Sequence, residues 1–437
     1  MRILYFAPRE CWPPNTGASL RNYHLARALA QDSRVTYLAF ADRAILPNGV
    51  REDAKSNGNG VARWCEEAII LSQPRAYTPM KLARGAFGTM PVTVLNYTSR
   101  RMAAELERVL SDDDFDLVQV ESVHLESYLP VIRRAHNRPL IVCDWHNIES
   151  DLMRQYGQRA TNPLRRAYAA RTATLIQALE RRMARVADAN TLVSESDRAR
   201  VLGIAPNART FVIENGVDVD YFSDEKIGQA FSAWSENNHQ EARFSDESRN
   251  RVLFVGSMDY HANIDAAIHL ARSIWPLVIK QLPEASLTIV GRNPTPEIRA
   301  LASLQNVEVT GTIEDIRPYY RGALASVAPI NVAGGSRLKI CEAMAAGVPV
   351  VSTRLGAEGI DATNGENIIL AETPDEFCQA LQQIAGSDRR WQSISVAGRR
   401  LVSEKYDWSI LGTRLAEIFR SLVAERSAKL NQRARST

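Results

Sequence analysis

The chain has 437 residues, of which 45% are hydrophobic and 24% are charged, and its 53 Lys and Arg residues nearly balance its 50 Asp and Glu residues. The hydrophobic content excludes an intrinsically disordered chain. The formal net charge of +3 gives no support to a nucleic-acid-binding protein, which would carry a dense basic stripe. The length favours two domains of about 200 residues each.

Cysteine usage and hydropathy indicate the compartment. The five cysteines form no CxxC pair and are widely scattered, at Cys11, Cys65, Cys143, Cys341 and Cys378. This spacing argues against a zinc site or a disulfide framework and favours a reducing compartment. The start of the chain lacks the long apolar stretch of a secretory signal, and no run of about eighteen uncharged apolar residues predicts a membrane span. We therefore expect a cytoplasmic protein.

The first half of the chain alternates apolar runs with helical patterns. A strand at 1–7, a Pro/Gly/Asn loop at 8–17, a helix at 18–30 and a strand at 35–40 form the opening of a doubly wound α/β domain. Further strands are predicted at 117–120, 140–143 and 189–193, and helices at 99–110 and 164–186. The strands at 117–120 and 140–143 are each followed by a polar loop with a histidine, His124 and His146.

In the second half, after a polar stretch, strands and helices are again predicted in alternation. We predict an N-terminal domain over 1–222, a linker or insertion over 223–250, a second α/β domain over 251–405, a helix over 406–425 that packs back on the first domain, and a disordered tail over 426–437. Strands are predicted at 252–255, 286–290, 307–310, 326–329, 348–352 and 367–370, with helices at 264–281 and 338–346 among them. Two doubly wound sheets place a ligand cleft between the domains.

The stretch APINVAGGSRLKICEAMAAGVPVVST at 328–353 carries the clearest chemical signal. A glycine-rich loop at 334–336 ends in a serine, which is a good N-cap residue, and a helix follows. The first amides of that helix, at 337–339, would point at a ligand, and a helix N-terminus favours phosphate. Arg337 and Lys339 add two cations suited to a diphosphate. Glu342 lies one turn further, where a carboxylate can accept hydrogen bonds from ribose hydroxyls.

This stretch resembles the donor-binding motif of the retaining, group 1 glycosyltransferases of the GT-B fold. Other segments resemble the same family in the same order: NTGASLRNYHLARAL at 15–29, DWHNIES at 144–150, TLVSESDRARVL at 191–202, VIENGVDVDYF at 212–222 and VLFVGSMDYHANIDA at 252–266. The overall pattern is nearest to the exopolysaccharide-associated branch. The resemblance implies two Rossmann-like domains that face each other across a cleft.

The resemblance also implies roles for individual residues. His146 would be the catalytic-centre residue, beside the transferred sugar. The donor, a UDP- or GDP-sugar, would be held by Gly17, Ala18, Gly256, Gly334, Gly335, Ser336, Arg337, Leu338, Lys339 and Glu342. The acceptor would be a hydroxyl of a saccharide or of a lipid-linked saccharide. Transfer would retain the anomeric configuration by front-face attack, with electrostatic stabilisation of the leaving diphosphate.

The chain departs from the family pattern at two places. The family usually has two glutamates eight positions apart, and the earlier one falls at Gly334, so the contact to the transferred sugar differs. The family also often carries an Arg and a Lys after the first strand of the second domain, whereas GSMDYHAN at 256–263 has neither. We predict that no metal or other cofactor is required, because the acidic run at 112–114 has the pattern of a turn before a strand.

Two other functions fit parts of the pattern. A non-catalytic nucleotide-sugar-binding scaffold would explain Gly334, and a GT-B-type nucleotide-sugar epimerase would share the phosphate site but need further carboxylates. A nicotinamide dehydrogenase is disfavoured because no G-x-G-x-x-G follows either first strand.

The region 154–185 is rich in arginine and either lies on anionic lipid or is a solvated basic face. Its arginines are Arg154, Arg159, Arg165, Arg166, Arg171, Arg181, Arg182 and Arg185.

Overall fold

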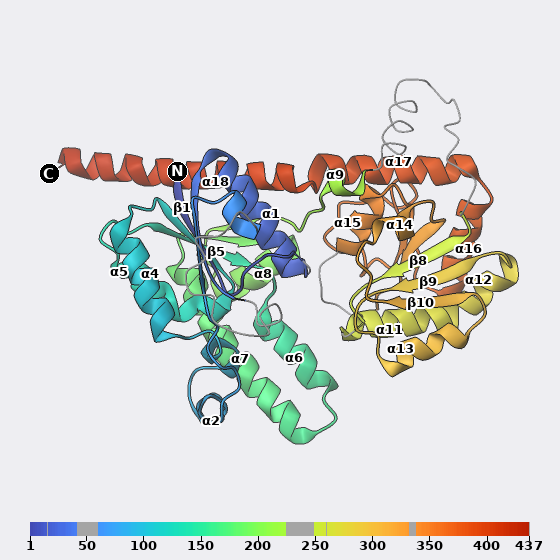
Figure 1. Ribbon diagram of the computed structural model, residues 1–437, viewed down its shortest axis with the longest axis horizontal. Helices are drawn as coiled ribbons and strands as arrows, with labels where there is room; N and C mark the ends of the chain where they lie inside the picture. Colours follow the sequence, from blue (N-terminus) through green and yellow to red (C-terminus); the bar gives the residue numbers. More distant parts are fainter. Residues whose placement is uncertain (15, 42–59, 224–248, 259, 332–337, 437) are drawn as a thin grey trace. The chain divides into compact units, whose positions relative to one another are not determined.

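The computed structural model describes residues 1–14, 16–41, 60–223, 249–258, 260–331 and 338–436 (Figure 1). These residues form two compact units. The first contains Met1–Glu214 and Leu411–Thr437, and the second contains Asn215–Ile410. Most of the predicted linker, 224–248, lies outside the described residues. None of the described helices is both long and apolar enough to cross a bilayer.

The first unit is built on a seven-stranded parallel sheet of order β3-β2-β1-β4-β5-β6-β7. Its strands are β1 Arg2–Ala7, β2 Arg34–Phe40, β3 Glu67–Leu71, β4 Leu117–Glu121, β5 Leu140–Trp145, β6 Ala189–Leu192 and β7 Thr210–Val212. The strand order reverses between β1 and β4, and ligands of doubly wound sheets bind outside the carboxyl ends of the strands at that point.

The second unit is built on a six-stranded parallel sheet of order β10-β9-β8-β11-β12-β13. Its strands are β8 Arg251–Val255, β9 Ser286–Val290, β10 Val307–Gly311, β11 Ala325–Ala328, β12 Val350–Ser352 and β13 Ile369–Leu370. Here the order reverses between β8 and β11. The two sheets confirm the predicted α/β class with two Rossmann-like units.

Helices fill the connections between the strands. Those of the first unit are α1 Gly17–Asp32, α2 Pro79–Phe87, α3 Val92–Leu95, α4 Arg100–Asp112, α5 Leu129–Arg134, α6 Glu149–Arg159, α7 Pro163–Val186 and α8 Glu195–Ile204, with short 3-10 turns at Gly60–Arg63 and Val123–Tyr128. Those that begin in the second unit are α9 Val219–Phe222, α11 His261–His269, α12 Trp275–Gln281, α13 Pro296–Ala300, α14 Arg317–Tyr320, α15 Leu338–Ala345, α16 Pro374–Ala385, α17 Asp388–Lys405 and α18 Trp408–Ser436.

The single helix predicted over 264–281 is interrupted. A π-helical turn, Leu270–Ile274, separates α11 from α12. Pro276 lies in the first turn of α12, and a proline inside an α-helix both lacks the N–H for the ladder and clashes with the carbonyl four residues earlier. A π turn widens the backbone at that point and relieves the clash.

Helix α18 extends beyond the predicted boundary at residue 425 and continues to Ser436, where we expected a disordered tail. Apolar residues at helical spacing bury its inner face in the first unit: Leu411, Leu415, Phe419 and Leu422. Ion pairs and charge-assisted hydrogen bonds extend this seam. Arg209 pairs with Glu425 at 2.7 Å, and Arg426 donates to the carbonyl of Asn137 at 2.6 Å. The basic composition led us to expect a tail, but Arg426 of this segment instead makes a hydrogen bond that holds α18 to the first unit.

Candidate active site

The first group of functional side chains lies where β4 and β5 end. Glu121 is the last residue of β4 and pairs in register with Asp144 of β5. His146 follows Trp145, the final residue of β5. Since β4 adjoins β1 at the reversal of strand order, these three residues lie at the edge where a doubly wound sheet binds ligands.

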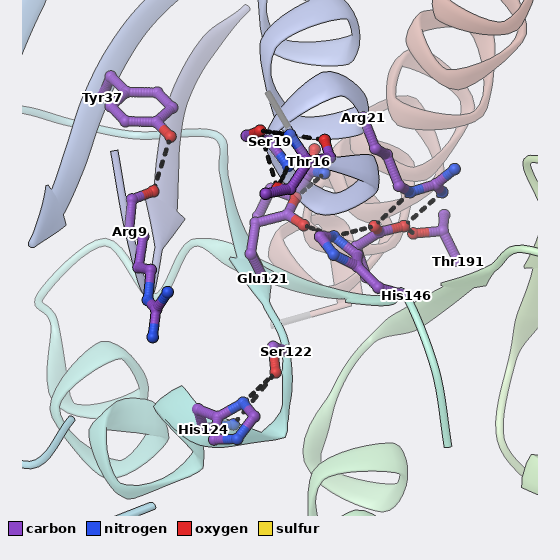
Figure 2. Close-up of polar contacts among 12 residues, drawn as sticks. Arg9, Thr16, Ser19, Arg21, Tyr37, Glu121, Ser122, His124, His146 and Thr191 are labelled. Carbon is purple, nitrogen blue, oxygen red and sulfur yellow. Dashed lines mark hydrogen bonds and ion pairs between the residues drawn. The ribbon is translucent and has the colours of Figure 1, made fainter. Parts of the chain in front are cut away.

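These residues form one buried hydrogen-bonded cluster. Nε2 of His146 lies 2.6 Å from Oε2 of Glu121 and 3.1 Å from Oδ2 of Asp144. Arg21 of α1 donates to both oxygens of Asp144, at 2.7 and 2.8 Å, and the hydroxyl of Thr191 donates to Oδ1 at 2.5 Å. Figure 2 shows His146 between Glu121 and the carboxylate that Arg21 and Thr191 contact. Only 1% of the Arg21 and Asp144 side chains is exposed, against 13% of His146.

Electrostatics hold the cluster in a charged form. Burial alone would lower the pKa of His146, but hydrogen bonds to Asp144 and Glu121 and their negative charges outweigh burial and raise that pKa to about 9. Burial raises the pKa of Asp144, but the Arg21 guanidinium reverses this effect and holds the pKa below its usual value. Burial and the neighbouring Asp144 raise the pKa of Glu121. Two cations, Arg21 and the imidazolium of His146, thus face Asp144 and Glu121.

The charged imidazole of His146 can donate a hydrogen bond in one further direction. Both carboxylates contact Nε2, whereas Nδ1 has no hydrogen-bond partner within the part of the chain that the structure describes. An imidazolium carries a proton on each ring nitrogen. His146 can therefore donate from Nδ1 to an oxygen of a bound ligand, but it has no free lone pair with which to act as a base.

The raised pKa of His146 predicts how stability depends on pH. The unfolded pKa is about 6.5, and the folded pKa is about 9. The stabilisation, on the order of 3 kcal/mol, should be fully present below the unfolded pKa and lost as pH rises through the folded one. Denaturant unfolding across this window should show a steeper fall for wild type than for His146→Gln. Parallel curves would contradict the assignment of an imidazolium.

The other histidine of this edge, His124, does not join the cluster. Its Nδ1 lies 2.6 Å from the hydroxyl of Ser122 (Figure 2). Burial, helped by the charges of Arg9 and His146, lowers the pKa of His124 to about 4. His124 is therefore neutral at neutral pH.

The predicted donor loop of the first unit is the start of α1. Thr16 caps this helix, and a capping box joins it to Ser19. Gly17 and Ala18 are the first two helical residues, so their amides have no acceptor within the helix. Gly17 is half-buried and Ala18 is exposed. Their expected contact with the donor phosphate stays a prediction.

The second group of candidate residues lies at the reversal of strand order in the second unit. Gly256 follows β8, and Leu338 and Lys339 begin α15, the helix after β11. The remaining predicted donor-binding residues, Gly334, Gly335, Ser336 and Arg337, lie outside the described residues.

Asn263 connects the two segments of this second group. Nζ of Lys339 donates to Oδ1 of Asn263 at 2.5 Å, and Nδ2 of Asn263 donates to the carbonyl of Ser257 at 2.9 Å. A Cβ at Gly256 would lie 2.8 Å from the Asn263 amide, so glycine is needed for this approach. The ammonium of Lys339 also lies 4.9 Å from the centre of the Phe254 ring, a favourable cation–π position.

Glu342 lies one turn beyond Lys339 and is half-buried. Burial raises its pKa to about 7, although Lys339 and Tyr320 oppose this effect. Near neutral pH its carboxyl group is therefore partly ionised, and the carboxylate can accept hydrogen bonds from ribose hydroxyls.

Arg21, Glu121, Asp144 and Asn263 were not predicted as functional residues. The sequence feature that could have identified Glu121 and Asp144 is a charged side chain near the end of an otherwise apolar strand, in VQVE at 118–121 and VCDW at 142–145. A charge at such a place is buried only if it is paired. The partner of Asp144 is far away in sequence, on α1, and no periodicity identifies it.

Comparisons with known proteins agree with this architecture. The family profile described as "Glycosyltransferase Family 4" matches residues 16–221, and the profile described as "Glycosyl transferases group 1" matches residues 249–387. The chain belongs to the group 1 glycosyltransferases of the GT-B fold.

Curated relatives match parts of the chain at low identity. It is 26% identical over 164 residues to an uncharacterised 44.6 kDa protein in the cps region of Klebsiella pneumoniae. It is also 26% identical over 254 residues to a GDP-mannose-dependent phosphatidylinositol monomannoside mannosyltransferase of Mycolicibacterium smegmatis. These matches cover 36% and 54% of this chain, and 42% and 63% of the two relatives.

The solved structures are similar in fold at low identity. Sucrose-phosphate synthase from Thermosynechococcus elongatus superposes with a TM-score of 0.66 at 17% identity, over 97% of this chain and 100% of that one. HepE of Anabaena, in complex with UDP and glucose, gives 0.58 at 14% identity, over 96% and 99%.

Proposed function

We propose that the protein transfers a sugar from a UDP- or GDP-sugar to a hydroxyl of a saccharide or lipid-linked saccharide, with retention, in exopolysaccharide or cell-surface glycan synthesis. The observation that carries this proposal is the pair formed by Lys339 and Glu342. They lie one turn apart on α15, the helix that follows β11, and β11 adjoins β8 where the strand order reverses. Both residues are within the segment that matches the group 1 profile.

The names of the relatives support both the proposed donor and the proposed acceptor. The M. smegmatis relative is named for GDP-mannose and a phosphatidylinositol glycolipid, and the HepE structures contain UDP, glucose or UDP-glucose. The K. pneumoniae relative is encoded in a cps region. Both donor bases therefore remain in the proposal, together with a saccharide or lipid-linked acceptor.

Each site contributes electrostatics to the proposed reaction. Negative charge develops on the leaving diphosphate, and Lys339 with the first amides of α15 is suited to stabilise it. Glu342 binds the ribose. His146 donates from Nδ1 to an oxygen of the transferred sugar, and Glu121 and Asp144 keep the ring charged and oriented. The leaving phosphate oxygen accepts the acceptor proton.

We expect transfer to proceed without a metal. Glu121, Asp144 and His146 each offer one ligand atom, and these atoms lie within 4.8 Å of one another, a spacing that could hold a cation. Arg21, however, already donates to both oxygens of Asp144, and a dication beside this guanidinium would be repelled. Transfer that persists after dialysis against a chelator would support this expectation.

Nucleotide binding tests the donor site. Lys339→Met should weaken binding of the preferred nucleotide sugar by roughly 10- to 100-fold, since a charge-assisted hydrogen bond contributes about 1.5–3 kcal/mol. Glu342→Gln should weaken binding of the nucleoside diphosphate as well. Calorimetry with UDP-, GDP-, ADP- and dTDP-sugars would measure both effects and identify the base.

The control is Lys280→Met, an exposed lysine on α12 of the same unit, which should bind like wild type. If no nucleotide sugar binds, the transferase proposal fails. Tight binding without transfer to any acceptor would instead favour a non-catalytic scaffold.

A further inference from the structure

Large apolar side chains are exposed at one end of the first unit. On α2, Met80 and Phe87 are 71% and 89% exposed, and at the start of α7, Leu164 is 79% exposed. Tyr77 and Tyr168 are also exposed beside them. A cluster of this kind marks an interaction surface rather than the isolated apolar residues found on any protein.

Helix α2 and the first turns of α7 turn these exposed apolar residues away from the unit. Gly85 is the only buried residue of α2, and helical spacing places Met80 and Phe87 on the opposite face. In the first turns of α7, Ala169 is the first buried residue, and Leu164 and Tyr168 lie on the face opposite to it.

The two helices are neighbours. The guanidinium of Arg171, on the same face of α7 as Leu164 and Tyr168, donates to the carbonyl of Gly88 at 2.7 Å. Gly88 caps the C-terminus of α2. Figure 1 shows α2 and the α6–α7 hairpin extending from the same end of the first unit. Their outer faces therefore form one surface.

This surface is basic as well as apolar. Residues 68–104 contain five lysines and arginines and no acidic residue, and residues 152–179 contain five arginines and no acidic residue. The arginines at 84, 165, 166 and 171 are all exposed. Asp151, just before the second segment, pairs with Arg154 at the base of the hairpin. A second copy of the same surface would meet it with like charge, so the charge pattern fits an anionic partner.

We propose that this end of the first unit, with the exposed apolar residues Met80, Phe87 and Leu164 and the exposed arginines Arg84, Arg165 and Arg166 around them, binds peripherally to a bilayer that contains anionic lipid. Apolar side chains of an interfacial helix enter the boundary between headgroups and acyl chains, while arginines bind lipid phosphates and tyrosines lie at headgroup level. This face is distinct from the predicted donor-binding residues, so the inference does not depend on the sugar-transfer chemistry.

Vesicle co-sedimentation of the full chain tests the inference. Vesicles of phosphatidylglycerol mixed with phosphatidylcholine should bind the protein, and pure phosphatidylcholine should not. Raising the salt from about 0.1 to about 1 M should release it, since the screening length falls from about 10 to about 3 Å. Arg165→Glu with Arg166→Glu should weaken binding at least about tenfold, and so should Phe87→Ser with Leu164→Ser.

Matched variants elsewhere provide the controls. Arg389→Glu with Arg400→Glu makes the same charge change on exposed residues of α17, and Leu304→Ser with Leu430→Ser removes two other exposed leucines; both should bind vesicles like wild type. Absence of vesicle binding, or equal loss in the controls, would overturn the inference while nucleotide-sugar binding remained. A wild-type dimer that Phe87→Ser with Leu164→Ser converts to monomer would assign the face to a second copy and also overturn it.

Discussion

Replacing Arg21 by methionine should destabilise the sheet of the first unit by roughly 3–5 kcal/mol, because removal of one partner leaves a buried carboxylate uncompensated. Asp144 is 1% exposed and receives two hydrogen bonds from the Arg21 guanidinium. In a chain with two units a single unfolding midpoint is ambiguous. Hydrogen exchange of the amides of β4 and β5 measures the opening of this sheet directly.

An exposed ion pair provides the comparison for Arg21. Arg400 pairs with Glu404 at 2.8 Å on the surface of α17, and Arg400→Met should cost less than about 1 kcal/mol. Adding Asp144→Asn to Arg21→Met should restore part of the stability, since the uncompensated charge is then absent. If Arg21→Met costs no more than Arg400→Met, Asp144 is not held as a buried anion.

Replacing His146 by alanine should reduce the rate of sugar transfer by about 10²- to 10⁴-fold, the range for loss of a positioned proton donor or electrostatic contact. Binding of the nucleotide should change little, because the predicted nucleotide contacts are made by other residues, among them Lys339 and Glu342 of α15. Measurement of transfer rate and nucleotide affinity on the same variant separates the two effects.

Glu121→Gln should show that the charge of His146 matters, and not only its presence. Loss of one anion beside Nε2 lowers the pKa of His146, so the alkaline fall in transfer rate should move to lower pH than in wild type. His136→Gln, which removes an exposed histidine paired with Asp114, should leave the profile unchanged. An unshifted alkaline limb in Glu121→Gln would exclude Glu121 from positioning the charged ring.

Local patterns predicted the elements of the fold well because they depend on neighbouring residues. The strands at 286–290 and 307–310 and the helix at 164–186 agree with β9, β10 and α7 within one residue. The break in the helix at 264–281 was not predicted, since it requires the steric effect of Pro276 on the preceding turn. The extent of α18 was not predicted because its ion pairs join residues far apart in sequence.

The residues of the candidate sites also fall into two groups, those that local motifs predict and those that only the tertiary fold brings together. His146, Lys339 and Glu342 could be proposed from motifs, whose residues are adjacent in sequence. The groups that set their chemistry could not, because Arg21 reaches Asp144, and Lys339 reaches Asn263, only through the tertiary fold. Whether a histidine at a strand end is charged depends on how many carboxylates the neighbouring strand brings to it, and sequence spacing does not contain that information.

The assignment of residues 411–436 to the first unit has a consequence for synthesis of the chain on the ribosome. The second unit is one continuous stretch, Asn215–Ile410, whereas the first is completed only by α18. Leu411, Leu415 and Phe419 are fully buried, so the apolar surface of the first unit that packs against them stays uncovered while the whole second unit is made. The nascent first unit exposes apolar surface during that interval, so a chaperone that shields this surface would act on the first unit until α18 packs against it.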